Sequence, residues 1–279
     1  MIFLIAIYGL KAIFLSVLTW IQSKFAYDVQ AIVSQRLFSG YLKQSWVFHI
    51  QRNSAQLIRN LTSESNLLSG SVVTPILILF TEIVVIIGIS ILLVLIEPLV
   101  TLVIIGGCAF FGIVIHVLFR KPISKWGKLR QMHEGMRIQY AQQGFGGVKD
   151  LKILGREEGV SSQYSKHNTG SANVSTKKAI IQLLPRLWLE FMAITSLALA
   201  ILLMLSQGRE VSSLISTVAV FGVASFRLLP SVNRIVISIQ SFHYGIPVIH
   251  NLYNELSSIG EIVQSDGKIF NFQDKIEIN

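Results

Sequence analysis

A 279-residue chain with 52% hydrophobic and only 14% charged residues is too apolar for a soluble globule, whose composition includes about 25% charge. Its net charge of +9 does not indicate nucleic-acid binding, because the basic residues lie between apolar blocks, as in membrane proteins, and do not form one patch. Cys108 is the only cysteine, which excludes an internal disulfide and a cysteine-based zinc site.

Five segments are apolar enough to cross a membrane as helices, which takes about 20 residues for about 30 Å of hydrocarbon. Their ranges are 1–21, 72–96, 99–119, 180–205 and 213–235. Glu97 and Pro98 form a tight turn between the second and third segments, and residues 206–210 form a short loop between the fourth and fifth. The sequence therefore predicts an all-α, multi-pass membrane protein with two membrane hairpins and one further span.

The basic residues predict which loops face the cytoplasm, because positively charged loops are retained there. The segment 22–71 carries five Lys or Arg residues, and the segment 120–178 carries twelve. The turns at 97–98 and 206–210 hold one base and two acids between them. We therefore expect both long segments on the cytoplasmic side, with Met1 outside and Asn279 inside.

Both cytoplasmic segments are predicted to be helical hairpins. Apolar residues recur at helical spacing after the first span, and proline is almost absent from both segments. About 20 helical residues extend about 30 Å, so each segment is long enough to descend and return. The turns are expected near 49–56 and near 142–158, where Gly144, Gly146 and Gly147 interrupt the helical pattern.

The second turn contains a short amphipathic stretch. Its apolar positions are Val148, Leu151 and Leu154, and its charged positions are Lys149, Asp150, Lys152 and Arg156. Such a helix suits docking on the surface of another protein, and it is equally typical of an ordinary turn between two helices. The pattern alone does not choose between the two.

Two segments of the chain resemble a known family. The stretch LFSGYLKQSWVFHIQRNSAQLIRNLTSESN, residues 37–66, and the stretch GGVKDLKILGRE, residues 146–157, resemble the two hairpin tips in the transmembrane domain of MsbA-like ABC exporters. Within that family, RNSAQLIRN and GGVKDLKILGRE look most like the branch of lipid-linked oligosaccharide flippases. The resemblance covers nearly the whole chain. It implies an ABC exporter-type transmembrane domain, with long helices that extend into the cytoplasm and two coupling helices.

The resemblance also implies partners and a location. Each coupling helix would contact an ATP-binding domain, and two copies of the chain would form a homodimer in the cell (inner) membrane. No nucleic-acid partner is expected. The residues expected to couple to the ATP-binding domain are Arg52, Asn53, Gly147, Val148, Lys149, Asp150 and Leu151.

Both ends of the chain look incomplete beside this family. Half-transporters of the family have six membrane helices, so five spans with Met1 outside suggest that the first helix is missing. Residues 1–255 would form the transmembrane domain. Residues 256–279 would form a linker and the truncated start of the ATP-binding domain, because apolar and polar residues alternate after Lys268 as in a strand. The chain has no GxxxxGK[ST] phosphate loop, so no catalytic site and no cofactor are expected in it, and ATP and Mg would bind on the missing domain.

Polar residues on the last span form the candidate substrate site. Arg227, Ser231 and Arg234 follow at i, i+4 and i+7 and therefore share one helix face. Arginines that face lipid are costly, so the stripe is predicted to line a water-filled cavity. Guanidinium groups match phosphate oxygens in geometry, and Arg186 on the fourth span is a further candidate. We therefore expect an anionic lipid or a lipid-linked saccharide as cargo.

A purely structural role for these residues stays open. In that interpretation Arg234 only extends to the inner interface, and Arg227 pairs with Glu82 or Glu190. Arg186 and Glu190 are one helical turn apart, so they are also able to neutralise each other.

The expected function is that of the membrane domain of an ATP-driven exporter, which is part of an ATP-hydrolysing translocase. It would move or flip a phosphate-containing lipid or lipid-linked saccharide by alternating access. A drug or peptide exporter is the alternative within this class, and a non-transporting membrane scaffold or channel is the alternative outside it. His116 and Cys108 have no second ligand at metal spacing, so no metal site is expected.

Overall fold

A computed structural model describes residues 2–96, 98–206 and 211–260 of the chain, and these residues form helices joined by short turns. The long helices are α1 (Ile2–Leu42), α5 (Thr74–Ile96), α6 (Pro98–Gly146), α8 (Glu157–Ser206) and α9 (Val211–Gly260). The short ones are α2 (Trp46–Gln51), α3 (Ser54–Arg59), η1 (Asn60–Glu64), α4 (Ser65–Leu68), η2 (Ser69–Val73) and α7 (Val148–Leu154). No strand occurs in these ranges, which confirms the predicted all-α class. The strand expected after Lys268 lies outside the described residues.

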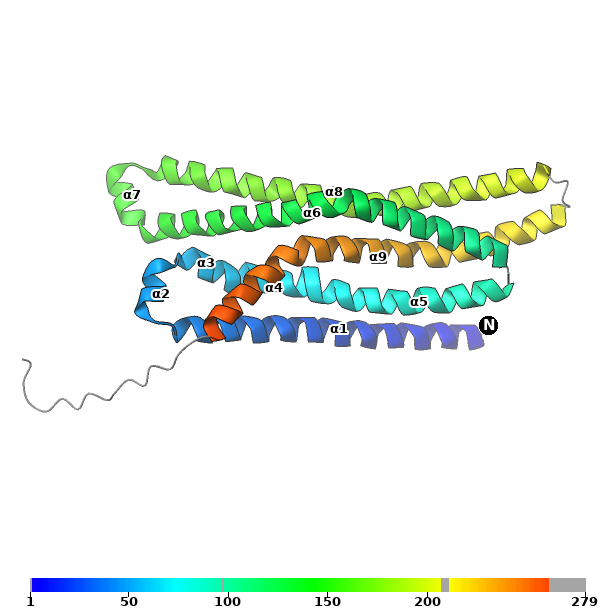
Figure 1. Cartoon of the computed structure of the whole chain (residues 1–279), viewed down its shortest axis with the longest axis horizontal. Helices are drawn as coiled ribbons and strands as arrows, with labels where there is room; N and C mark the ends of the chain where they lie inside the picture. Colours follow the sequence, from blue (N-terminus) through cyan, green and yellow to red (C-terminus); the bar gives the residue numbers. More distant parts are fainter. Residues whose placement is uncertain (1, 97, 207–210, 261–279) are drawn as a thin grey trace, which may run out of the picture.

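The long helices lie side by side as one elongated bundle (Figure 1). The short helices α2 and α7 both lie at one end of this bundle, and the end of α5 and the start of α6 lie at the other end (Figure 1). Helix α6 has 49 residues, which is about 70 Å at 1.5 Å per residue and more than twice the thickness of the hydrocarbon core. The prediction that the helices continue far beyond the membrane is therefore confirmed.

The predicted spans fall on these long helices. Among the described residues, two stretches are long and apolar enough to be candidate membrane spans, Ile5–Leu42 and Ser54–Leu92. They contain most of the first two predicted spans. The other three predicted spans lie on α6, α8 and α9 and stay predictions.

The arm that returns from the first tip contains two π-helical segments, η1 and η2. A π turn holds an extra residue, which interrupts the regular ladder, and such turns are frequent at functional sites. Five polar side chains in this arm are buried: Asn60, Glu64, Ser65, Ser69 and Ser71. The arm therefore directs an unusual number of polar groups into the bundle.

Two of the clusters of buried apolar residues join long helices that are distant in the sequence. One cluster joins α1 to α9 and contains Leu37, Tyr41, Val248 and Leu252. The other joins α6, α8 and α9 and contains Ile123, Val174, Ile181 and Tyr244. By contrast, α1 exposes large apolar side chains such as Phe3, Leu10 and Trp20 along its first half. Lipid removes the cost of exposing such groups, so this pattern fits a helix that is inserted in a membrane.

Candidate coupling tips and membrane arginines

The first tip, residues 43–53, is a sharp turn that contains α2. The turn begins where the backbone N–H groups of Lys43 and Gln44 bond to the carbonyls of Gly40 and Tyr41. It ends at Asn53, whose side-chain oxygen accepts the N–H of Ala55 at 2.9 Å and thereby caps α3. The turn was predicted near 49–56, so it lies several residues earlier in the chain than the sequence indicated.

Helix α2 turns an apolar face away from the bundle. Trp46 is 76% exposed and Ile50 is 67% exposed, and Val47 beside them is also exposed. Phe48 points the other way and packs on the ring of Tyr41, with 6.1 Å between the ring centroids. Helix α2 lies at the end of the bundle, at the side where α1 ends and away from the N-terminus (Figure 1).

The second tip, residues 147–156, contains α7. Gly147 precedes the helix, and Gly155 follows it with φ of 62°, a left-handed conformation that glycine adopts without a steric penalty. The predicted helix at 148–154 is present. Of the three glycines predicted to interrupt the helix, Gly147 forms the turn, Gly146 is the last residue of α6, and Gly144 lies within α6, so the prediction is wrong for Gly144.

The second tip is also apolar on its outside. Val148 and Leu154 of the predicted stripe are exposed, while Leu151 is half-buried. Ile153 is 72% exposed and Phe145 at the end of α6 is exposed as well, and the sequence did not single out either residue. Lys152 forms an ion pair with Glu157 at 2.9 Å, which joins the tip to the start of α8.

Arg52 and Asn53 were expected to contact a partner, but in this structure they have partners within the chain. Asn53 caps α3, as described above. Arg52 points toward α9, where its Nη1 lies 2.8 Å from Oε1 of Glu255. The residues of the second tip that were expected to couple, Gly147, Val148, Lys149, Asp150 and Leu151, form the short stretch from the start of α7 to its middle.

Glu64 is the centre of a largely buried ionic cluster that the sequence did not reveal. Its side chain has 0% exposure and accepts a hydrogen bond from Arg130 Nη2 at 3.0 Å. Arg59 Nε lies 3.8 Å from the same carboxylate, and the amide of Gln131 donates to it at 3.4 Å. One carboxylate therefore faces two largely buried guanidinium groups, from α3 and α6.

Two arginines of the predicted membrane spans, Arg234 and Arg186, also have carboxylate partners. Arg234 forms an ion pair with Glu82 of α5, and its Nη2 donates to Glu82 Oε2 at 3.3 Å. Arg186 donates to Glu190 at 2.9 Å along the exposed side of α8. The pairing of Arg186 with Glu190 was foreseen, whereas the contact of Glu82 with Arg234 was not. The side chain of Arg227 lies outside the described residues.

The polar stripe on α9 faces the bundle to a large extent. Ser231 is buried, and so is Ser238 one further turn along the stripe. Arg234 between them is half-exposed and reaches across to α5. The stripe therefore lies along the contact between α9 and α5. Within the stripe, the charge of Arg234 is neutralised by its ion pair with Glu82.

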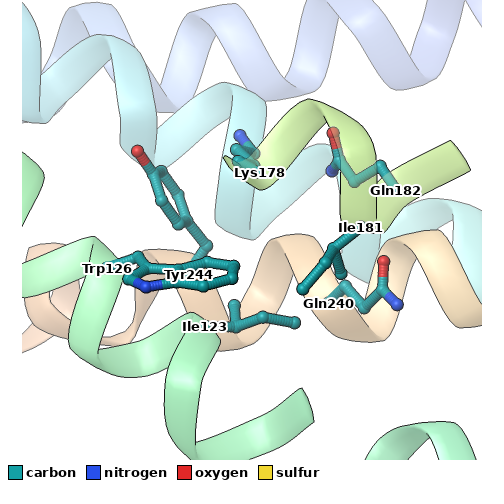
Figure 2. A pocket seen from close by; sticks show the side chains of 7 residues that line it. All are labelled: Ile123, Trp126, Lys178, Ile181, Gln182, Gln240 and Tyr244. Atoms are coloured by element: carbon teal, nitrogen blue, oxygen red, sulfur yellow. The ribbon is translucent and has the colours of Figure 1, made fainter. Parts of the chain in front are cut away.

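A small pocket between α6, α8 and α9 was also missed by the sequence reasoning (Figure 2). It is lined by Ile123, Trp126, Lys178, Ile181, Gln182, Gln240 and Tyr244. Its cavity volume is about 10 Å³, which is room for about one water molecule. Lys178 Nζ lies 4.3 Å from the centroid of the Tyr244 ring, and burial together with Arg130 lowers the pKa of this lysine. Space for one water is too little for a lipid headgroup.

The chain belongs to the family described as the ABC transporter transmembrane region, whose model matches residues 1–228. It is also similar to a solved structure, described as a bacterial Atm1-family ABC exporter with ATP bound, at 12% sequence identity and a TM-score of 0.67. The similarity covers 88% of this chain and 43% of that chain, so the present chain spans less than half of that exporter. At this identity the likeness establishes the fold of the membrane domain, which is the fold predicted from the sequence.

Proposed function

We propose that the chain is the membrane domain of an ATP-driven exporter and that its two tips bind an ATP-binding domain. The observation that carries this proposal is the pair of exposed apolar surfaces on α2 and α7 at the same end of the bundle. Exposed apolar patches outside the membrane mark interaction sites. ATP and Mg would bind on the partner domain, and this chain would supply the helices that move.

We also propose that the cargo is a phosphate-containing lipid or a lipid-linked saccharide, which the exporter flips by alternating access. Support comes from Arg227, Ser231 and Arg234 on one face of α9 and from Arg186 on α8. In this structure the guanidinium group of Arg234 forms an ion pair with Glu82. A cargo phosphate would have to compete with that carboxylate, so separation of α9 from α5 would expose the cargo site.

This proposal includes assembly of two copies of the chain in the cell (inner) membrane, so that residues 1–255 of each copy form half of the pathway. A drug or peptide exporter would use the same fold with another cargo. A scaffold or channel would bind no ATP-binding domain at its tips.

The cargo proposal is tested with the double variant Arg227→Gln/Arg234→Gln in the complete transporter, reconstituted in liposomes. Each lost charge-assisted hydrogen bond is worth about 1.5 to 3 kcal/mol, so flipping of a lipid-linked substrate should fall at least about ten-fold per residue. The control Arg36→Gln changes an exposed arginine of α1 far from the stripe and should leave flipping unchanged. Normal flipping by a well-folded double variant would exclude a role for the two arginines in cargo binding.

A further inference from the structure

A chain of polar contacts joins the first tip to the last turns of α9. Arg52 Nη1 donates to Glu255 Oε1 at 2.8 Å, and the hydroxyl of Tyr41 donates to Glu255 Oε2 at 3.1 Å. The side-chain amide of Asn60 donates to the same hydroxyl at 3.1 Å, and the amide of Asn251 donates to Asn60 Oδ1 at 2.7 Å. We name these five residues the tip–α9 latch. They come from α1, the first tip, η1 and α9.

The centre of the latch is shielded from water, so its contacts are stronger than those of a fully exposed ion pair. Tyr41, Asn60 and Glu255 are buried, Asn251 is half-buried, and Arg52 is partly open to solvent. Arg52 also lies over the ring of Phe48, with 5.2 Å from its guanidinium carbon to the ring centroid. Each of the five side chains donates or accepts a hydrogen bond in this network. Such networks hold one geometry more firmly than isolated pairs do.

Apolar packing supports the latch from both sides. The cluster of Leu37, Tyr41, Val248 and Leu252 joins α1 to α9 next to it. Gly40, just before the first tip, lies so close to α9 that a Cβ atom there would be 2.3 Å from Cγ2 of Ile259. The first tip and the end of α9 therefore form one tightly connected unit.

The second tip has no comparable connection to α9 in the described part of the chain. Its ion pair, Lys152 with Glu157, joins it to its own arm α8, and both side chains are largely exposed. A displacement of the first tip would therefore act directly on α9. A displacement of the second tip would act first on α6 and α8.

We propose that Arg52 and Glu255 are positioning residues that transmit movement of the first tip to α9. Arg234 lies 21 residues before Glu255 in the same helix, about 30 Å along its axis, and is the residue that binds Glu82 of α5. Movement of the base of α9 would therefore act on the α9–α5 contact. This inference rests on the proposed function, because it requires an ATP-binding domain to move the tip.

The first test uses Glu255→Gln in the complete transporter with its ATP-binding domain. We expect ATP turnover without cargo to stay within about two-fold of the parent protein, and the amount of cargo moved per ATP to fall about ten-fold. The control Arg137→Gln breaks an ion pair with Glu134 at 2.7 Å within α6 and should change neither quantity. Equal losses of ATP turnover and transport would mean that Glu255 is only structural, and no loss of either would also overturn the proposal.

A charge exchange adds a readout that a merely structural role would not give. Arg52→Glu and Glu255→Arg should each uncouple transport from ATP turnover, and the combined variant should recover at least half of the cargo moved per ATP. Failure of the combined variant to recover coupling, with both single variants folded, would contradict the latch.

A distance measurement separates failure of the latch from failure of the proposed function. Spin labels at Gln51 and Ser257, both exposed, are introduced in the chain carrying Cys108→Ser. The latch predicts one narrow distance distribution in the parent chain and a clearly broader one with Glu255→Gln. This result needs no ATP-binding domain, so it stands even if no ATP-driven transport is found. An unchanged distribution would overturn the latch.

Discussion

The two tips of the bundle expose similar apolar surfaces but are attached to it in different ways. The first tip is held by buried polar partners, with Arg52 bonded to Glu255 and Phe48 packed on Tyr41. The second tip is held by glycine turns and by one exposed ion pair. The difference teaches that a similar outer surface does not imply a similar mechanical role. The first tip is part of the core, and the second is an extension of the α6–α8 hairpin.

The ionic cluster behind the first tip gives the largest expected effect. Glu64→Gln removes the carboxylate that Arg59 and Arg130 share, which leaves two largely buried guanidinium groups without this ion-pair partner. Loss of one partner from a buried ion pair costs about 3 to 5 kcal/mol, so we expect the free energy of unfolding to fall by about that amount. Denaturant titration in detergent micelles measures it.

The matched control for this prediction is Glu157→Gln, which removes the exposed ion pair of the second tip. We expect no measurable loss of stability from it, since exposed pairs contribute little. A cost for Glu157→Gln as large as that for Glu64→Gln would contradict the distinction between an anchored first tip and a free second tip.

Two glycines near the tips give an effect of intermediate size. At Gly40 a new Cβ would clash with Ile259, and overpacking of this kind costs about 1 to 3 kcal/mol. At Gly146 nothing lies within 4 Å, so alanine should stabilise α6 by up to about 1 kcal/mol through its higher helix propensity. Melting temperatures of Gly40→Ala and Gly146→Ala should therefore shift in opposite directions. Stabilisation by both variants would show that α1 and α9 are not tightly packed at the first tip.

The smallest expected effect is a pH dependence in the arms of the second tip. His133 on α6 and His167 on α8 approach with 3.2 Å between their Nδ1 atoms, and burial lowers the pKa of His167, with His133 and Lys166 adding to the effect. The folded chain therefore binds protons less readily than the unfolded chain, so stability should decline as the pH falls below about 6.5, the ordinary pKa of histidine.

Melting curves at pH 7.5 and pH 5.5 check this pH dependence. The parent chain should melt at a slightly lower temperature at pH 5.5, and His167→Asn should reduce the difference. An equal difference in the variant would assign the pH dependence to other groups.

Local sequence patterns predicted the long helices and the two tips. They did not predict contacts between residues that are far apart in the sequence. Apolar runs and the Gly147 boundary are local, and they located α7 within the predicted turn. The latch joins Arg52 to Glu255, residues that are 203 positions apart, and no periodicity links them. Glu82 was recognised as a membrane carboxylate, but its partner depends on how α5 and α9 are aligned. That alignment is set by packing, so the sequence did not indicate that Arg234 would be a partner of Glu82.

The most direct test of the account is binding of the ATP-binding domain to the tips. Ile50→Asp and Ile153→Asp place a charge in the centre of each exposed apolar surface, and Ile32→Asp does the same at an exposed position on α1 away from the tips. The binding constant of the purified membrane domain for the ATP-binding domain is measured for each variant. A central interface residue contributes about 2 kcal/mol or more, so both tip variants should bind about 30-fold more weakly and the Ile32 variant normally. Normal binding by both tip variants would contradict the account.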